Sequence, residues 1–214
     1  MKAFLDDFRD IHIDGTVVIC ATGKSAEVMR EFHDIHYRMI QTIGVNAFEW
    51  MYDLTPFYSV FSDKIDMPVE TDEHYAKHKA ILNNYSMYSF THNDNDFRFS
   101  MPVGYRFQDV KSDDLDKMLN RNLLPSCVTT TEIAIGLALY MGFKNIGIIG
   151  FDLYDYIAHT HSEIINQGCD IFQEHAKRKG VNIWNLSEHS AVTSFPYIPF
   201  NEFVDNWGAD KNGD

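Results

Sequence analysis

Six side chains that could take part in chemistry follow one apolar segment of the chain. They are Asp152, Tyr154, Asp155, Tyr156, His159 and His161. An imidazole with its ordinary pKa of ~6.5 can take a proton near neutral pH, carboxylates can hold a metal, and phenols can hydrogen-bond a phosphate. The preceding residues 146–151, Ile-Gly-Ile-Ile-Gly-Phe, lack polar alternation and predict a strand covered on both faces. Ligands of open α/β sheets bind outside the carboxyl ends of such strands, so the six side chains are expected at that edge.

A helix is expected directly before this strand, beginning near Thr129. Ile133, Leu137 and Tyr140 recur at helical spacing, and the small residues between them would let the helix pack closely on a sheet. Gly142 suits the end of this helix, because glycine readily adopts the conformation of a C-cap. The helix, the turn and the strand together form half of a βαβ unit.

A second candidate site follows the first apolar strand, predicted at residues 16–21. The sequence Thr-Gly-Lys-Ser occupies residues 22–25, and a helical stretch follows at residues 26–37. Ser25 is a candidate N-cap, and the N–H groups of a helix start favour an anion such as a phosphate. A P-loop would need an earlier Gly, where this chain has Val17–Ile19, so we do not assign that motif. An ordinary turn with a capping Ser stays open.

Polar residues end two further apolar strands. Residues 39–46 end on Asn46, and residues 57–63 end on Asp63. An Asn or Asp at the end of a parallel strand can bond a base or a ribose, and it can equally cap a helix. Parallel strands present their carboxyl ends at one edge, so both residues are expected near the first turn.

Two groups of residues in the middle of the chain have spacings that could bind a metal. His74 and His78 lie four apart on an expected helix, but no Glu stands between them as in zinc proteases, so a solvated face is the preferred interpretation. Asp94-Asn95-Asp96 has the D-x-D form that many nucleotide-sugar enzymes use for a divalent cation. Three polar residues in a polar loop are a weak signal, and we assign no metal.

Strands and amphipathic helices alternate along the chain. Further strands are expected at residues 85–90 and 181–187, and further helices at residues 112–120 and 163–179. Residues 91–110 are polar, aromatic and aperiodic, which predicts a loop. This order predicts an α/β fold, a Rossmann-like three-layer sandwich with a mainly parallel twisted sheet.

The length of 214 residues and the hydrophobic content of 45% allow one sizeable core, and no Pro/Gly/Ser-rich linker divides the chain. We therefore expect a single nucleotide-binding domain over residues 1–207. The segment from Glu188 onward is expected to pack on the surface over the site. Residues 208–214 are expected to form a disordered tail.

The composition also limits the kinds of partner that the protein is expected to bind. A net charge of −13 and a pI near 5.1 argue against nucleic acid and anionic membranes, which both reward clustered Lys and Arg. The first ten residues are not those of a signal peptide, and no apolar run reaches the length of a transmembrane segment. Cys20, Cys127 and Cys169 have unrelated spacings and are interpreted as reduced thiols. We expect a cytoplasmic protein and leave open whether it forms a homo-oligomer.

These segments together resemble the bacterial sialyltransferases of glycosyltransferase family 42, and more loosely α/β domains of the 6-hydroxymethylpterin diphosphokinase-like group. The resemblance runs from about Val17 to Leu186. Its local matches are VVICATGKSAE (17–27), GVN (44–46), VTTT (128–131), GFKNI (142–146), GFDLY (150–154) and His161-Ser162. Gly23 and Ser25 match the nucleotide-binding turn of the family. Asn46 falls where an Asn of the family holds the cytidine nucleotide.

The resemblance implies that a sugar is transferred, without a metal, from a nucleotide-activated donor to a hydroxyl acceptor such as a glycan. The donor that it suggests is CMP-sialic acid. His161 would take the acceptor proton, and Tyr154 and Tyr156 would hydrogen-bond the leaving phosphate in place of a metal. This chemistry requires no cofactor. The residues implied in nucleotide binding are Thr22, Gly23, Ser25, Asn46, Asp63, Thr129, Thr130 and Asp152.

The chain departs from the family pattern at three places, which keeps alternatives open. Cys127 stands where the family has an Arg, Thr131 or Glu132 stands where a Gly is usual, and the loop between Tyr154 and His161 is shorter. One alternative is a diphosphokinase-like enzyme that uses ATP and magnesium, with Asp152 or Asp155 as metal ligands. Another is a catalytically inactive nucleotide-binding protein. In the blander interpretations, His161 is a helix cap or surface residue and Tyr154 packs at a strand end.

Overall fold

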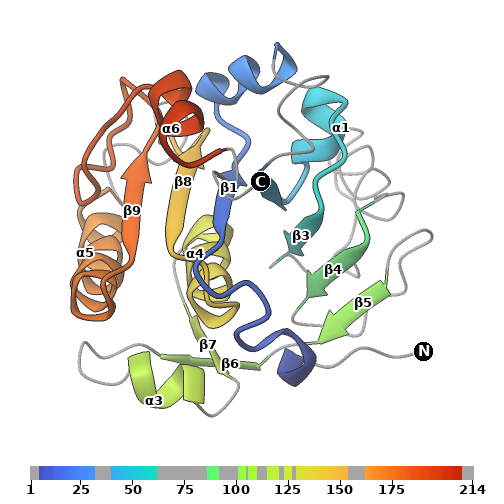
Figure 1. The fold of residues 1–214 in the computed structure, drawn as a ribbon, viewed down its shortest axis with the longest axis vertical. Coiled ribbons are helices and arrows are strands. Elements are labelled where there is room, and N and C mark those ends of the chain that lie inside the picture. Colours follow the sequence, from blue (N-terminus) through green and yellow to red (C-terminus); the bar gives the residue numbers. More distant parts are fainter. Residues whose placement is uncertain are drawn as a thin grey trace, which may run out of the picture.

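A seven-stranded parallel sheet forms the centre of the described part of the protein (Figure 1). The structure is a computed structural model, and it describes residues 5–31, 40–61, 86–91, 101–104, 106–109, 115–120, 123–126, 129–153 and 162–208. In spatial order the strands are β5 (Met101–Gly104), β4 (Tyr88–Thr91), β3 (Tyr58–Phe61), β2 (Gln41–Val45), β1 (Thr16–Cys20), β8 (Asn145–Ile149) and β9 (Asn182–Asn185). Every neighbouring pair is parallel. The predicted α/β, Rossmann-like fold is therefore confirmed.

The winding of the sheet reverses beside β1, the fifth of its seven strands. Val17 pairs with Gln41 of β2 on one side and with Ile146 of β8 on the other. From β1 the chain adds β2 to β5 outward in one direction, and it later places β8 and β9 on the opposite side. The carboxyl ends of β1 and β8 therefore border the switch point, where ligands bind in open α/β sheets.

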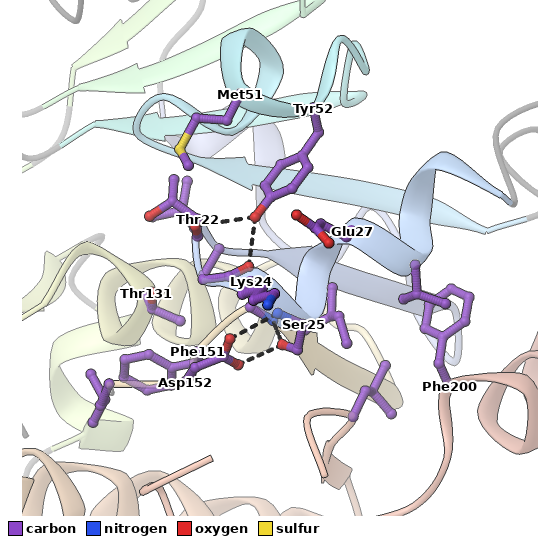
Figure 2. Close-up of a pocket in the computed structure, with 18 of the residues that line it drawn as sticks. Thr22, Lys24, Ser25, Glu27, Met51, Tyr52, Thr131, Phe151, Asp152 and Phe200 are labelled. Carbon is purple, nitrogen blue, oxygen red and sulfur yellow. Dashed lines mark hydrogen bonds between the residues drawn. The ribbon is translucent and has the colours of Figure 1, made fainter. Parts of the chain in front are cut away.

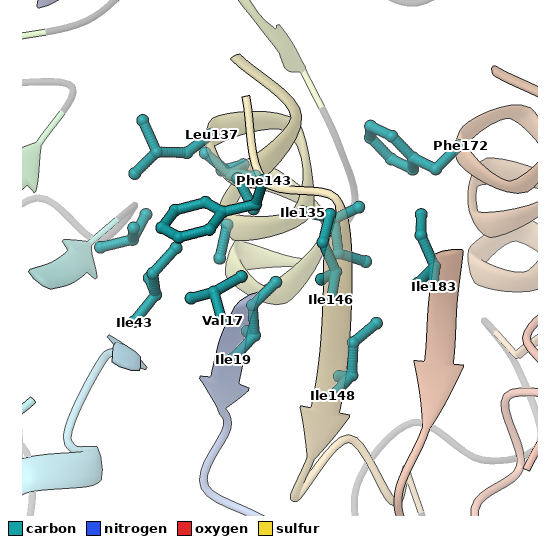
Figure 3. Close-up of a cluster of buried hydrophobic side chains, with 14 of the residues drawn as sticks. Val17, Ile19, Ile43, Ile135, Leu137, Phe143, Ile146, Ile148, Phe172 and Ile183 are labelled. Atoms are coloured by element: carbon teal, nitrogen blue, oxygen red, sulfur yellow. The ribbon is translucent and has the colours of Figure 1, made fainter. Parts of the chain in front are cut away.

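Successive residues of β1 point to opposite faces of the sheet, and each face has its own apolar core. Val17 and Ile19 lie in the core under α4 and α5, and Figure 3 shows them with the buried residues of these helices. Val18 and Cys20 lie in the other core, under η2, α1 and α6. The helices of the first face are η1 (Leu5–Phe8), α3 (Leu115–Asn120), α4 (Thr130–Tyr140) and α5 (Ser162–Lys179), and those of the second are the 3₁₀ helix η2 (Lys24–Arg30), α1 (Phe48–Tyr52) and α6 (Phe200–Trp207).

The predicted loop at residues 91–110 contains two strands. β5 pairs with β4 at the edge of the sheet, and β6 (Arg106–Asp109) forms a separate two-stranded parallel sheet with β7 (Leu123–Ser126). The prediction of a continuous loop is wrong because β5 contains Pro102, which lacks an N–H and opposes a strand assignment. An edge strand tolerates Pro, since only one of its sides pairs.

The C-terminal segment belongs to the core instead of packing on the surface. Ile198, Phe200, Phe203 and Val204 are buried in the second core, and α6 is a helix that the sequence interpretation did not include. The segment before α6 is bonded to β9, because the N–H of Ile198 donates to the carbonyl of Asn185 at 3.1 Å. α6 therefore covers the sheet directly beside its carboxyl edge.

The first turn also differs from its prediction. The helix expected from Ala26 begins at Lys24 as a 3₁₀ helix, and Gly23 occupies the N-cap position in place of Ser25. The Ser25 side chain does not cap the helix, because it is hydrogen-bonded to Asp152, which follows β8, and to Ser187, which follows β9.

Several predictions fall on residues outside the described ranges. These are Asp63, His74, His78, residues 94–96, Cys127, residues 154–161 and residues 209–214. Cys20 and Cys169 are free and buried, and burial raises the pKa of both thiols, so they stay protonated. None of the described helices is long and apolar enough to cross a membrane.

Replacing Phe203 tests whether α6 is an integral part of the fold. Its side chain is fully buried, so Phe203→Ala is expected to lower the free energy of unfolding by about 3–5 kcal/mol in urea denaturation. Phe57, 40% exposed, is the matched control, and Phe57→Ala should cost only about 1 kcal/mol. Equal losses in the two variants would contradict the assignment of α6 to the core.

Candidate functional site

A cavity of about 1430 Å³ opens at the carboxyl ends of the central strands. Seven residues implied in nucleotide binding line it, namely Thr22, Gly23, Ser25, Asn46, Thr129, Thr130 and Asp152. They come from the ends of β1, β2 and β8 and from the start of α4. The structure thus brings together residues more than a hundred positions apart in sequence. The remaining candidates, Asp63, Tyr154, Tyr156 and His161, lie outside the described residues.

The turns that follow β1 and β8 touch through their backbones. The N–H of Gly23 donates to the carbonyl of Gly150 at 2.8 Å. A Cβ on Gly23 would lie only 2.4 Å from that carbonyl oxygen, so no larger residue fits without moving a backbone. Gly150 has a φ of +77°, a left-handed conformation that favours glycine. Both glycines are therefore required by the close approach of the two turns.

A carboxylate and two hydroxyls lock these turns together, and Figure 2 shows the part of this network between Asp152 and Ser25. Asp152 accepts the Ser25 N–H at 2.8 Å through one oxygen and the Ser25 hydroxyl at 2.5 Å through the other. Because Ser25 has a single hydroxyl proton, the Ser187 hydroxyl must be the donor in the 2.7 Å contact between the two serines. The N–H of Gly150 points at both hydroxyl oxygens, at 3.0 and 3.2 Å. The network joins the ends of β1, β8 and β9.

This network changes where a phosphate can bind. The sequence predicts free N–H groups at the helix that begins near Ser25, but the Ser25 N–H donates to Asp152 and the Ala26 N–H donates to the Gly23 carbonyl at 3.0 Å. A carboxylate of the protein thus occupies the place expected for an anion. A bound phosphate would have to lie against another group of the cavity.

The start of α4 supplies a second helix N-terminus at the cavity. Thr129 is its N-cap in a capping box, in which Glu132 accepts the Thr129 N–H at 2.8 Å and the Thr129 hydroxyl at 2.9 Å. Thr129, Thr130 and Thr131 line the cavity, and α4 is buried against the first core. The positive end of the helix dipole therefore faces the cavity from a rigid element.

Asn46 directly follows β2 and has a left-handed backbone conformation. Its φ is +52°, and its N–H donates to the Val60 carbonyl of β3 at 3.0 Å. Its side-chain Oδ1 is buried and has no hydrogen-bond partner among the described residues. A buried acceptor without a partner costs about 1–3 kcal/mol, and Asn46 lines the cavity. The edge of the cavity therefore contains an acceptor that no described residue satisfies.

Tyr52, on α1, is a site residue that the sequence interpretation missed. Its hydroxyl donates to the carbonyl of Gly23 at 2.6 Å and lies 3.2 Å from that of Thr22, so it holds the first turn from above (Figure 2). Burial, reinforced by the charges of Glu27 and Asp152, raises the pKa of Tyr52 to about 12. The phenol therefore remains a hydrogen-bond donor at physiological pH.

Ser187 is the second residue that the sequence interpretation missed. It follows β9, it is 2% exposed, and its N–H donates to the Asn185 side chain at 3.0 Å. The rule that selected Asn46, a polar residue at the carboxyl end of an apolar strand, would also have selected Ser187. Among the described residues, no group of three or more His, Cys, Asp or Glu side chains is placed to hold a metal ion.

The fold is similar to that of two solved glycosyltransferases, although the chain matches no family model and no curated protein sequence. The MAf glycosyltransferase from Magnetospirillum magneticum AMB-1 aligns with a TM-score of 0.58 over 92% of this chain at 15% identity. This chain spans only 39% of that protein. The sialyltransferase CstII from Campylobacter jejuni, in complex with the substrate analogue CMP-3FNeuAc, aligns with a TM-score of 0.50 at 13% identity. That alignment covers 90% of this chain and 98% of CstII.

Replacing Asp152 tests whether its carboxylate holds the two turns. Asp152→Asn keeps the shape but turns one acceptor into a donor that faces Ser25, so the free energy of unfolding should fall by about 1.5–3 kcal/mol. Asp170→Asn, at an exposed position of α5, is the control and should stay within about 0.5 kcal/mol of the parent. Urea unfolding of both variants gives the comparison. An Asp152→Asn protein as stable as the control would refute this role.

Proposed function

We propose that the protein binds a pyrimidine nucleotide-activated sugar, with a CMP-linked donor favoured, and transfers the sugar to a hydroxyl acceptor. The observation that carries this proposal is Asn46, which lines a cavity at the switch point of the sheet and whose Oδ1 has no partner among the described residues. A carbonyl oxygen needs a donor, and both the amino group of cytosine and the hydroxyls of ribose are donors. The likeness in fold to CstII in complex with CMP-3FNeuAc supports the same ligand class.

The donor phosphate is assigned to the start of α4 and not to the turn after β1. The N–H groups of Ser25 and Ala26 have acceptors within the protein, and the Thr129 N–H likewise donates to Glu132. The assignment therefore rests on the positive end of the α4 dipole, which Thr130 and Thr131 bring to the cavity. Lys24 and Arg30 of η2 add two positive charges to the cavity lining, which also carries Glu27, Asp152 and Glu188. The positive end of α4 is therefore the feature that favours an anion at this place.

The proposed chemistry needs one base and hydrogen bonds to the leaving phosphate. His161 takes the proton of the acceptor hydroxyl as the acceptor oxygen bonds the anomeric carbon of the donor sugar. The bond from that carbon to the phosphate oxygen breaks, and the nucleotide leaves as the monophosphate, with Tyr154 and Tyr156 donating hydrogen bonds to it. His161 immediately precedes α5 in the sequence, and the positive end of a helix dipole disfavours an added positive charge beside it.

Binding of CMP by calorimetry tests the assignment of Asn46. Asn46→Gly removes the amide but permits the left-handed backbone, so CMP affinity should fall by about fivefold to a hundredfold with the melting temperature nearly unchanged. Asn46→Ala should also lose affinity.

Gln41 provides the matched control for this measurement. Its Oε1 is likewise buried without a partner within the described residues, but it lies at the opposite end of β2 and does not line the cavity. Gln41→Ala should leave CMP affinity within about twofold. If the parent protein binds no CMP, or if Asn46→Gly binds it as tightly as the parent, the proposed donor site is wrong.

Replacing the two loop histidines separates the base from its neighbour. His161 directly precedes the first residue of α5, whereas His159 lies two residues further from it, and we expect the residue beside the helix start to be the better-anchored base. His161→Ala is therefore expected to abolish release of CMP from the donor while CMP affinity stays within a few fold, and His159→Ala should do much less. Equal losses, or full activity of His161→Ala, would show that another residue is the base.

A further inference from the structure

Tyr197 presents an exposed aromatic ring at the mouth of the cavity. It is 47% exposed and lines the cavity, whereas Phe195 and Ile198 beside it are buried. The flanking backbone is bonded to β9, because the Asn185 N–H donates to the Pro196 carbonyl at 2.9 Å and the Ile198 N–H donates to the Asn185 carbonyl at 3.1 Å. The main chain therefore holds this ring at the surface, where it has no part in the core.

Tyr197 lies at the end of the cavity away from Asn46. Asn46 ends β2, and Tyr197 lies beside Asn185 of β9. The strand order β2-β1-β8-β9 places three strand spacings between β2 and β9, or ~14 Å at ~4.8 Å per spacing, and Tyr197 lies one position beyond β9. The cavity thus has a second end that a nucleotide bonded to Asn46 and α4 would leave free.

The charge around Tyr197 differs from that proposed for the donor end. Glu188 lines the cavity beside it, and the charges of Glu188 and Glu202 both act on the phenol. Lys24, Glu27 and Arg30 of η2 line the same cavity, so what distinguishes the surroundings of Tyr197 is the pair Glu188 and Glu202. The charges of this pair disfavour a second phosphate or a carboxylate beside Tyr197. Carboxylates do accept hydrogen bonds from hydroxyl groups, and an exposed aromatic face can pack against the apolar face of a sugar ring.

We propose that the β9 end of the cavity is the acceptor subsite and takes a neutral sugar, stacked on Tyr197 with hydroxyls bonded to Glu188 and His189. The proposal rests on the proposed function, since it names the class of acceptor for the same transfer. In this proposal, residues that follow β9 determine which acceptor binds, and the donor binds at the end of the cavity formed by β2 and α4. An uncharged acceptor can then approach a cavity whose rim is acidic.

The test measures sugar binding in the presence of saturating CMP. Saturation-transfer NMR would titrate a panel of methyl glycosides of glucose, galactose, mannose and N-acetylglucosamine, with glucuronate and galacturonate as charged counterparts. We expect at least one neutral glycoside to bind and both uronates to bind more weakly. Tyr197→Ala should weaken the neutral glycoside by about threefold to tenfold, whereas Tyr197→Phe, which keeps the ring, should stay within about twofold. Glu188→Gln should improve uronate binding by about twofold.

Two controls separate this inference from the proposed function. CMP affinity should be unchanged in Tyr197→Ala, and Phe57→Ala, which removes an exposed ring beyond the cavity lining, should leave sugar binding unchanged. If CMP does not bind the parent protein, the proposed function fails. The acceptor subsite alone is overturned if CMP binds but no neutral glycoside does, or if a glycoside displaces CMP. It is also overturned if the uronates bind better than the neutral glycosides, or if Tyr197→Ala binds sugar as tightly as the parent protein.

Discussion

The hydrogen bonds between Asp152 and Ser25 hold the candidate site together. They join the turn after β8 to the turn after β1, and these turns come from segments 127 positions apart in the chain. The Gly23 and Gly150 backbones can touch only because neither residue carries a side chain there. Ser187 then ties the end of β9 to the same point through its hydroxyl. These hydrogen bonds therefore hold the ends of β1, β8 and β9 in fixed positions at the mouth of the cavity.

This brace also bears on where the proposed ligand would lie. The Asp152 carboxylate satisfies the N–H of Ser25, and the proposed function therefore places the phosphate at the start of α4. Asn46 stands near that helix with an acceptor that needs a donor, and Tyr197 stands at the β9 end among acidic groups. The proposed function thus assigns an anionic donor to one end of the cavity and a neutral acceptor to the other.

The central strands could be predicted from sequence because each is a short apolar run, as at residues 146–149 in β8. β5 could not, because Pro102 argues against a strand unless the strand is known to lie at an edge. α6 did carry a signal: Phe200, Phe203, Val204 and Trp207 recur at helical spacing, but the Pro-containing segment before them suggested irregular structure. Asn46 could be found as a strand end. The role of Ser25 could not, because its partner is distant in sequence.

The central claim is that the β2 and α4 end of this cavity binds a pyrimidine nucleotide through Asn46. The most direct measurement is a crystal structure of the protein in complex with CMP. The account predicts CMP in the cavity with a donor group of cytosine or ribose within about 3.2 Å of Asn46 Oδ1 and its phosphate at the start of α4. CMP bound away from Asn46, with its phosphate on the turn at Gly23, would contradict it.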